Sequence, residues 1–194
     1  MWGLLPVFLI LFFFWRGLPG AYHIRMAWYL LPKLIFANRR DGKLPWNWES
    51  VLTFRVYPDD LDWNLHMNNS SYNKLCDFAR YSHLAVFFGR SVAGANGGVM
   101  MRFKKSLGPF ERFELRTRIV GATSKWIFVE HRFMGSNGRC KACGLCKLCI
   151  FEEGRVVDPR PLLGIPEADQ QCRAGELMLL AEPHYGRDLS EKEF

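Results

Sequence analysis

The sequence predicts an α+β domain in which an antiparallel sheet packs on one long helix. One strand-like segment precedes a helical segment, and four strand-like segments follow the helix in succession. The connections between the later segments are short and rich in turn-forming residues, which is typical of antiparallel hairpins. Strands and helices do not alternate along the chain, so a parallel Rossmann-type sheet is not expected.

The first strand is expected at residues 51–57, where apolar and β-branched residues alternate with polar ones. The helix is expected over residues 70–88, because its apolar residues recur at intervals of three and four. One of the residues at 69–71 supplies the N-cap and Gly89 ends the helix. The glycine-rich residues 94–98 are expected to form a turn.

Four more strands are expected at about 99–106, 112–121, 125–135 and 139–152. The connection before the last of them contains Asn137-Gly138, which is a strong hairpin signal. Residues 155–161 lead out of the sheet, and a short helix is expected at 167–180 within a polar, acidic C-terminal segment.

The N-terminus is apolar enough to predict a membrane anchor. Residues 1–15 carry no charge, and the apolar run reaches about residue 18 with only Arg16 inside it. That length is close to the lower limit of about 17–25 residues for a spanning helix. A second apolar stretch at 21–37 is expected to form an amphipathic helix on the membrane surface. A cleaved signal peptide and a buried core helix are the alternatives.

The predicted organisation is an anchor with a juxtamembrane segment at 1–40, a folded domain at 46–164 and an acidic tail at 165–194. Much of the net charge of +7 lies beside the anchor, because residues 1–48 contain six bases and one acid. By the positive-inside rule the domain then faces the cytosol from a single-pass anchor, in the endoplasmic reticulum or another organelle membrane. The charge therefore indicates membrane orientation, and nucleic acid is not expected as a partner.

Four of the six cysteines follow a C-x2-C-x2-C-x2-C pattern at Cys140, Cys143, Cys146 and Cys149. The pattern resembles a metal site, but it falls where the fold requires a strand. Side chains alternate along a strand, so these four thiols would point to two opposite faces. Buried small side chains are favoured over a metal site, and neither metal nor cofactor is expected.

The loop before the helix concentrates side chains that ionise or form hydrogen bonds. A carboxylate there can act as a general base or a nucleophile, and an imidazole can carry a proton. The adjoining helix N-terminus favours a developing negative charge. These are the parts that acyl transfer requires, although a loop whose polar residues only satisfy turns and the helix cap is the alternative. The side chains in question are Asp59, Asp60, Asp62, Asn64, His66, Asn68 and Asn69.

The segment V-Y-P-D-D-L-D-W-N-L-H-M-N-N-S-S-Y, followed by D-F-A-R at 77–80, resembles the signature of the hotdog-fold acyl thioesterases. This family is the 4-hydroxybenzoyl-CoA thioesterase-like superfamily, and the resemblance implies a curved antiparallel sheet wrapped around a central helix. The apolar N-terminus with H-M-N-N and D-F-A-R resembles its membrane-anchored branch of the "thioesterase superfamily member six" kind. The matching positions are Asp60, Asp62, Asn64, His66, Asn68, Asn69 and Tyr72.

The resemblance implies hydrolysis of a fatty acyl thioester at a membrane surface, with Asp62 as general base or nucleophile. Asn64 and His66 would position water or donate to the oxyanion, with backbone N–H groups near Asn69 completing the oxyanion hole. Contacts with an acyl-CoA or acyl-carrier-protein substrate are implied for Asn68, Tyr72, Arg102, Lys104 and Lys105.

The family also implies a homodimer that shares the site between protomers. The stretch after the helix at 103–107 lacks the further acid and cysteine of the plant-type enzymes. A non-catalytic acyl-binding or scaffold protein on the same fold is therefore the alternative function.

Overall fold

The computed structural model describes residues 6–7, 20–37 and 44–166 of the 194-residue chain. The helical segments that build the fold are α2 (Ala21–Ala37), the 3-10 turn η3 (Pro58–Asp60), α3 (Asn69–Phe88) and α4 (Pro159–Leu163). The strands are β1 (Glu49–Arg55), β2 (Ala93–Phe103), β3 (Arg112–Ala122), β4 (Ile127–Gly135), β5 (Cys140–Glu152) and β6 (Arg155–Val157).

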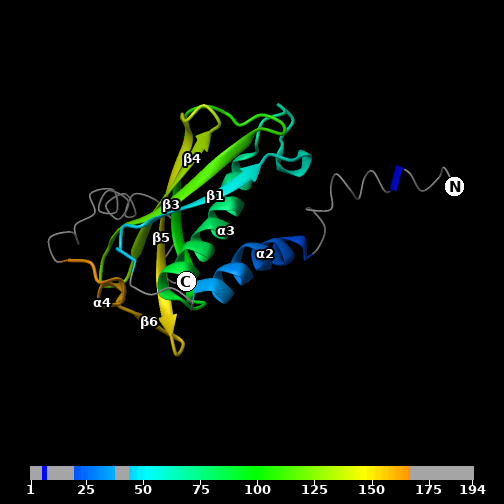
Figure 1. Ribbon diagram of the computed structural model, residues 1–194. Coiled ribbons are helices and arrows are strands. Elements are labelled where there is room, and N and C mark those ends of the chain that lie inside the picture. Colours follow the sequence, from blue (N-terminus) through cyan, green and yellow to red (C-terminus); the bar gives the residue numbers. More distant parts are fainter. Residues whose placement is uncertain (1–5, 8–19, 38–43, 167–194) are drawn as a thin grey trace, which may run out of the picture.

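The sheet is antiparallel throughout, in the order β1-β3-β4-β5-β2, with β6 paired to β5 outside this path. It curves around α3, and α2 lies alongside α3 (Figure 1). The α+β prediction is confirmed, and the arrangement of sheet and helix is the one that the hotdog resemblance implies. Strands β1 and β2 form the two edges of the main sheet, so loops and helices beside them have room for binding sites.

The glycine-rich segment 94–98 is part of a strand, so the prediction of a turn there was wrong. Strand β2 pairs with β5 from Ala93 onward and contains a bulge between Asn96 and Gly98. Gly97 lies against the indole of Trp126, where an added Cβ would approach the ring to 2.5 Å. Glycine is needed here for this close approach and not for a reversal of the chain.

The interior consists of two apolar clusters, one at each end of α3. The first gathers Leu75, Phe78, Phe113 and Phe133 around the start of the helix. The second gathers residues around Leu84 and the far ends of β3, β4 and β5. Each cluster packs α3 against the sheet. Together they fix the position of the helix N-terminus.

A buried polar layer lies between the two clusters. Ser50 on β1 is paired with Thr117 on β3, which is paired with His131 on β4. The Oγ1 of Thr117 lies 3.0 Å from Nδ1 of His131, and the Oγ of Ser50 lies 2.8 Å from Nδ1 of His83 on α3. Both histidines are at most 1% exposed, and burial lowers the pKa of each imidazole. They are therefore neutral structural groups at pH 7.

Helix α2 has the bounds predicted for the second apolar stretch. It packs on α3 through Ala21, which is 3% exposed, and through Tyr22 and Tyr29, whose rings contact Phe78. No helix among the described residues is long and apolar enough to cross a membrane. Apart from residues 6–7, the predicted anchor over 1–18 lies outside the described residues, as does the helix expected at 167–180.

The cysteine run lies on strand β5, as the alternation argument requires. Cys146 is buried in the interior, whereas Cys143, three positions earlier on the strand, is half-buried. Cys149 directs its Sγ toward the carbonyl of Ala95 on β2, at 3.7 Å. Within the described residues, no group of three or more metal-binding side chains comes together.

Candidate active site

The buried carboxylate of Asp60 holds the loop between β1 and α3 in place through contacts with the helix and with the loop backbone. Its Oδ1 lies 3.1 Å from Nζ of Lys74 on α3, and its Oδ2 accepts the N–H of Tyr57 at 3.3 Å. The carbonyl of Asp60 accepts the N–H of Asn68 at 2.7 Å. Asp60 is fully buried, so it anchors the loop to the helix and does not face a substrate.

Asp62 lies at the base of a tight loop, and one of its two carboxylate oxygens accepts hydrogen bonds from the loop backbone. Its Oδ1 accepts the N–H groups of Asn64 at 2.9 Å and His66 at 3.2 Å. Its own N–H donates to the carbonyl of His66 at 2.9 Å, and Leu65 closes the loop with φ of 54°. Among the described residues the second oxygen, Oδ2, has no hydrogen-bond partner. The loop therefore fixes a half-buried carboxylate and leaves one oxygen available for chemistry.

Helix α3 begins beside this carboxylate. Its N-cap is Asn68, one residue before the predicted range, and the Asn68 Oδ1 accepts the N–H of Ser70 at 2.8 Å. The N–H of Ser71 donates to the carbonyl of Asn68 at 2.9 Å. Capping uses these two N–H groups, and Asn69 is the first-turn residue that faces the adjoining cavity. The positive end of the helix dipole thus points toward the site.

A cavity of about 510 Å³ opens between this loop, the start of α3 and the end of β2. It contains six of the nine predicted site residues. Three others lie apart from it: Asn64 is exposed at the loop tip, Asn68 caps the helix, and Arg102 is exposed on β2. The lining consists of Asp62, His66, Met67, Asn69, Tyr72, Phe103, Lys104, Lys105 and Ser106.

The cavity lining contains both aromatic and basic side chains. The ring of Tyr72 is 2% exposed and makes edge contacts with Phe103 at 5.1 Å and Phe133 at 4.8 Å between centroids. Burial raises the pKa of the Tyr72 phenol, which therefore stays protonated. The side chains of Lys104 and Lys105 are exposed, and their backbone N–H groups donate to the carbonyl of Lys141 at 2.8 and 2.9 Å. The cavity therefore suits a ligand with an apolar part and an anionic part.

Sequence reasoning missed four contributors to this site, among them Ser106 in the cavity lining. Lys74 was not singled out, because its ion pair with Asp60 depends on how the loop folds back on α3. Phe103 and Met67 were not predicted to line the cavity either. A usable signal for Phe103 was its position at the end of β2, directly before the predicted Lys104 and Lys105.

Comparison with known proteins identifies the family of this chain. The sequence pattern of the family described as the Thioesterase-like superfamily matches residues 56–161, which include the loop, α3 and most of the sheet. Protein THEM6 of Danio rerio is 37% identical over 131 residues, which are 62% of this chain and 65% of that protein. Protein THEM6 of Xenopus laevis is 39% identical over 85 residues, 41% of each chain. The chain thus matches less than two thirds of the length of either relative.

A solved structure shares the fold. The DHNA-CoA thioesterase from Staphylococcus aureus is similar with a TM-score of 0.51, covering 70% of this chain and 95% of its own at 11% identity. At that identity the likeness concerns the arrangement of the sheet and the central helix only. The family match extends over more than half of the chain and includes the loop that carries Asp62. The chain therefore belongs to the thioesterase-like superfamily.

Proposed function

We propose that this protein hydrolyses a fatty acyl thioester in the cavity beside Asp62. The observation that carries the proposal is the hydrogen bonding of the Asp62 carboxylate. Two backbone N–H groups hold its Oδ1, while its Oδ2 has no partner among the described residues and borders a cavity at a helix N-terminus. A fixed carboxylate beside an anion-stabilising helix end is what attack on an acyl carbonyl requires.

Two routes use the same geometry. As a general base, Oδ2 of Asp62 takes a proton from water, and the oxygen of that water bonds to the thioester carbonyl carbon. As a nucleophile, Oδ2 bonds to that carbon itself and forms a mixed anhydride, which water then cleaves. In both routes the C–S bond breaks when the tetrahedral oxyanion collapses, and the electron pair leaves with sulfur. The products are a carboxylate and a thiol.

The surrounding groups have matching roles. Asn69, at the first turn of α3, is placed to donate its N–H to the oxyanion, and the helix dipole stabilises the same charge. His66 lines the cavity and is exposed enough to pass a proton to the departing thiolate. The side chain of Asn64 lies outside the lining, so its backbone N–H, which orients Asp62, is its contribution.

The composition of the cavity lining supports the proposed substrate class. The exposed Lys104 and Lys105 suit the phosphates of coenzyme A or of a carrier protein's phosphopantetheine. The apolar wall of buried Met67 and Tyr72 with the exposed Phe103 suits the first methylenes of an acyl chain. Arg102 lies outside the lining on β2 and would meet a carrier at the surface. The reaction would take place at a membrane, with the predicted N-terminal anchor holding the domain on the cytosolic side.

A homodimer is part of the proposal. Strand β2 is eleven residues long and pairs on one side only, with β5, within the described part of the chain. Unpaired edges of that length favour pairing with another strand. Its exposed Met100 and Phe103 would be covered by a second copy, and Phe103 also lines the cavity. Light scattering should then show a dimer, and a Met100→Lys variant should shift it toward the monomer.

The test is a panel of acyl thioesters that varies chain length and compares coenzyme A with carrier protein. Wild type should release thiol, and Asp62→Asn should lower kcat by about a hundredfold or more, the scale of general acid–base catalysis. Asparagine keeps an oxygen at the position of Oδ1, so the loop should stay folded. Asp59→Asn is the matched control, because Asp59 lies in the same loop and outside the cavity lining. Equal kcat for wild type and Asp62→Asn would refute the role of Asp62.

The second candidate is an acyl-binding protein without turnover. It is favoured by the lack of a further acid on the segment after α3 that faces the cavity, where the side chains are Phe103, Lys104, Lys105 and Ser106. The panel separates the two functions, since a binder would retain acyl-CoA and release no thiol from any member.

A further inference from the structure

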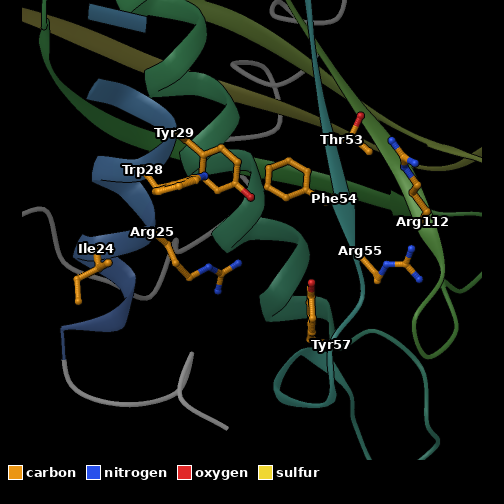
Figure 2. Close-up of a pocket in the computed structure, with 9 residues that line it drawn as sticks. All are labelled: Ile24, Arg25, Trp28, Tyr29, Thr53, Phe54, Arg55, Tyr57 and Arg112. Carbon is orange, nitrogen blue, oxygen red and sulfur yellow. The ribbon is translucent and has the colours of Figure 1, made fainter. Parts of the chain in front are cut away.

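A second cavity lies away from the Asp62 site, on the opposite edge of the sheet. Its volume is about 680 Å³, within the range of about 300–1,000 Å³ typical of small-molecule sites. It opens between α2 and β1 and shares no lining residue with the cavity beside Asp62. Its lining is Ile24, Arg25, Trp28, Tyr29, Thr53, Phe54, Arg55, Tyr57 and Arg112 (Figure 2).

The inner part of this cavity is apolar and aromatic. Figure 2 shows the rings of Tyr29 and Phe54 facing one another between α2 and β1, and their centroids are 5.1 Å apart. Trp28 and Ile24 complete the apolar lining from α2, where they are 78% and 65% exposed. Such a lining suits a hydrocarbon chain.

The outer part is cationic. Arg55 on β1 and Arg112 on β3 are directly paired across the two strands, and like charges at such positions repel each other. Neither guanidinium forms an ion pair within the part of the chain that the structure describes; Arg55 donates only to the carbonyl of Phe110, at 3.1 Å. The carboxylate of Glu114, further along β3, is already paired with Arg116 at 2.9 Å. An anion bound between Arg55 and Arg112 would relieve their repulsion.

A third arginine approaches from the helix. Arg25 is 7% exposed, its guanidinium lies 4.9 Å from the centroid of the Phe78 ring, and its side chain extends from α2 toward the β1 side of the cavity (Figure 2). Within the described residues the cavity therefore has three arginines in its lining and no acidic residue. This charge pattern favours an anionic ligand over a cationic one.

The apolar lining continues onto the outside of α2. Ile24, Trp28, Leu31 and Ile35 form a stripe at helical spacing, and each is more than half exposed. Ile24 and Trp28 belong both to this stripe and to the cavity. A hydrocarbon chain in the cavity thus has a continuous apolar path to the surface of α2.

We infer that this cavity binds a single-chain amphiphile with an anionic head group. The head lies between Arg55 and Arg112, and the chain lies over Tyr29 and Phe54 toward the exposed stripe of α2. The head is a carboxylate, as in a free fatty acid, or a phosphate, as in a lysophosphatidate. The binding does not depend on hydrolysis at Asp62.

The test uses the full-length chain in a neutral detergent with dibromostearate as a quencher of tryptophan emission. Quenching should saturate, and Trp28→Phe should remove part of it, because Trp28 lines the cavity. The double variant Arg55→Gln, Arg112→Gln should bind about tenfold more weakly or worse, the scale of one lost charge-assisted contact. Arg155→Gln, at an exposed arginine on β6, is the matched control and should bind as wild type does.

Competition identifies the head group and supplies a second readout that needs no variant. Palmitate should displace the probe if the head is a carboxylate, and lysophosphatidate should do so better if it is a phosphate. A long-chain alcohol should compete at least about tenfold more weakly than the better anion. An alcohol that competes equally well, or a folded double variant with wild-type affinity, would overturn the inference. None of these ligands is a thioester, so failure of the proposed hydrolysis would leave the result unaffected.

Discussion

Acid should destabilise this protein through His83, a buried histidine of α3. Burial lowers the pKa of this imidazole from 6.5 to about 4 in the folded chain. Between these two values the unfolded chain binds a proton that the folded chain does not, so stability falls as the pH falls. The contribution of neutral His83 to the free energy of unfolding is fully present above pH 6.5 and is lost progressively down to about pH 4.

The size of the effect follows from this shift. Proton linkage at His83 alone lowers the free energy of unfolding by about 2 kcal/mol between pH 7 and pH 5. The loss reaches about 3 kcal/mol when the titration is complete. His131 adds to the loss in the same direction, because burial also lowers its pKa. A loss of this size is a large fraction of the stability of a typical domain, about 5–15 kcal/mol.

The assay is urea unfolding of wild type and His83→Gln at pH 7, 6 and 5, followed by tryptophan fluorescence. The His83→Gln variant should lose about 2 kcal/mol less than wild type over this interval, since glutamine does not titrate. Ser50→Ala is the control: it removes the hydrogen-bond partner at 2.8 Å but leaves a buried imidazole, so its pH dependence should stay close to that of wild type. Identical pH slopes for wild type and His83→Gln would refute the reasoning.

Substitutions at Gly97, Asn68 and Lys74 test three further contacts of the fold. Gly97→Ala should lower the free energy of unfolding in urea by about 1–3 kcal/mol, because the new Cβ meets the indole of Trp126 at 2.5 Å. In a Trp126→Leu background the same substitution should lower it much less. An equal loss in both backgrounds would contradict the contact. Asn68→Ala should lower the free energy of unfolding by about 1 kcal/mol through loss of the α3 cap, whereas Asn68→Asp should not. Lys74→Met should lower the free energy of unfolding by about 3–5 kcal/mol, because it leaves the buried carboxylate of Asp60 without its cation. A loss below about 1 kcal/mol would show that this ion pair does not hold the loop in place.

The regular elements could be predicted from the sequence because periodicity is local. Apolar spacing of three and four placed α3 within one residue of its observed start, and alternation placed β3, β4 and β5. The segment 94–98 was mistaken for a turn, because its glycines look the same in a turn and in a strand that passes close to an indole. Only the position of Trp126, some 30 residues away, distinguishes the two.

The candidate site was predictable where its residues are consecutive. Asp62, His66 and Asn69 lie in one loop and one helical turn, so a short motif brings them to one cavity. The cavity between α2 and β1 could not be predicted in this way. It depends on the register that sets Arg55 opposite Arg112 and on the packing of α2, both of which are long-range properties.

The central claim is that the carboxylate of Asp62 performs chemistry on a bound acyl thioester. The most direct measurement compares turnover of an acyl-CoA with binding of its non-hydrolysable thioether analogue, in wild type and in Asp62→Asn. Both proteins should bind the analogue with Kd values within about threefold, while only wild type should release thiol at an appreciable rate. Undiminished thiol release by Asp62→Asn, or the absence of thiol release by wild type that binds the analogue, would contradict it.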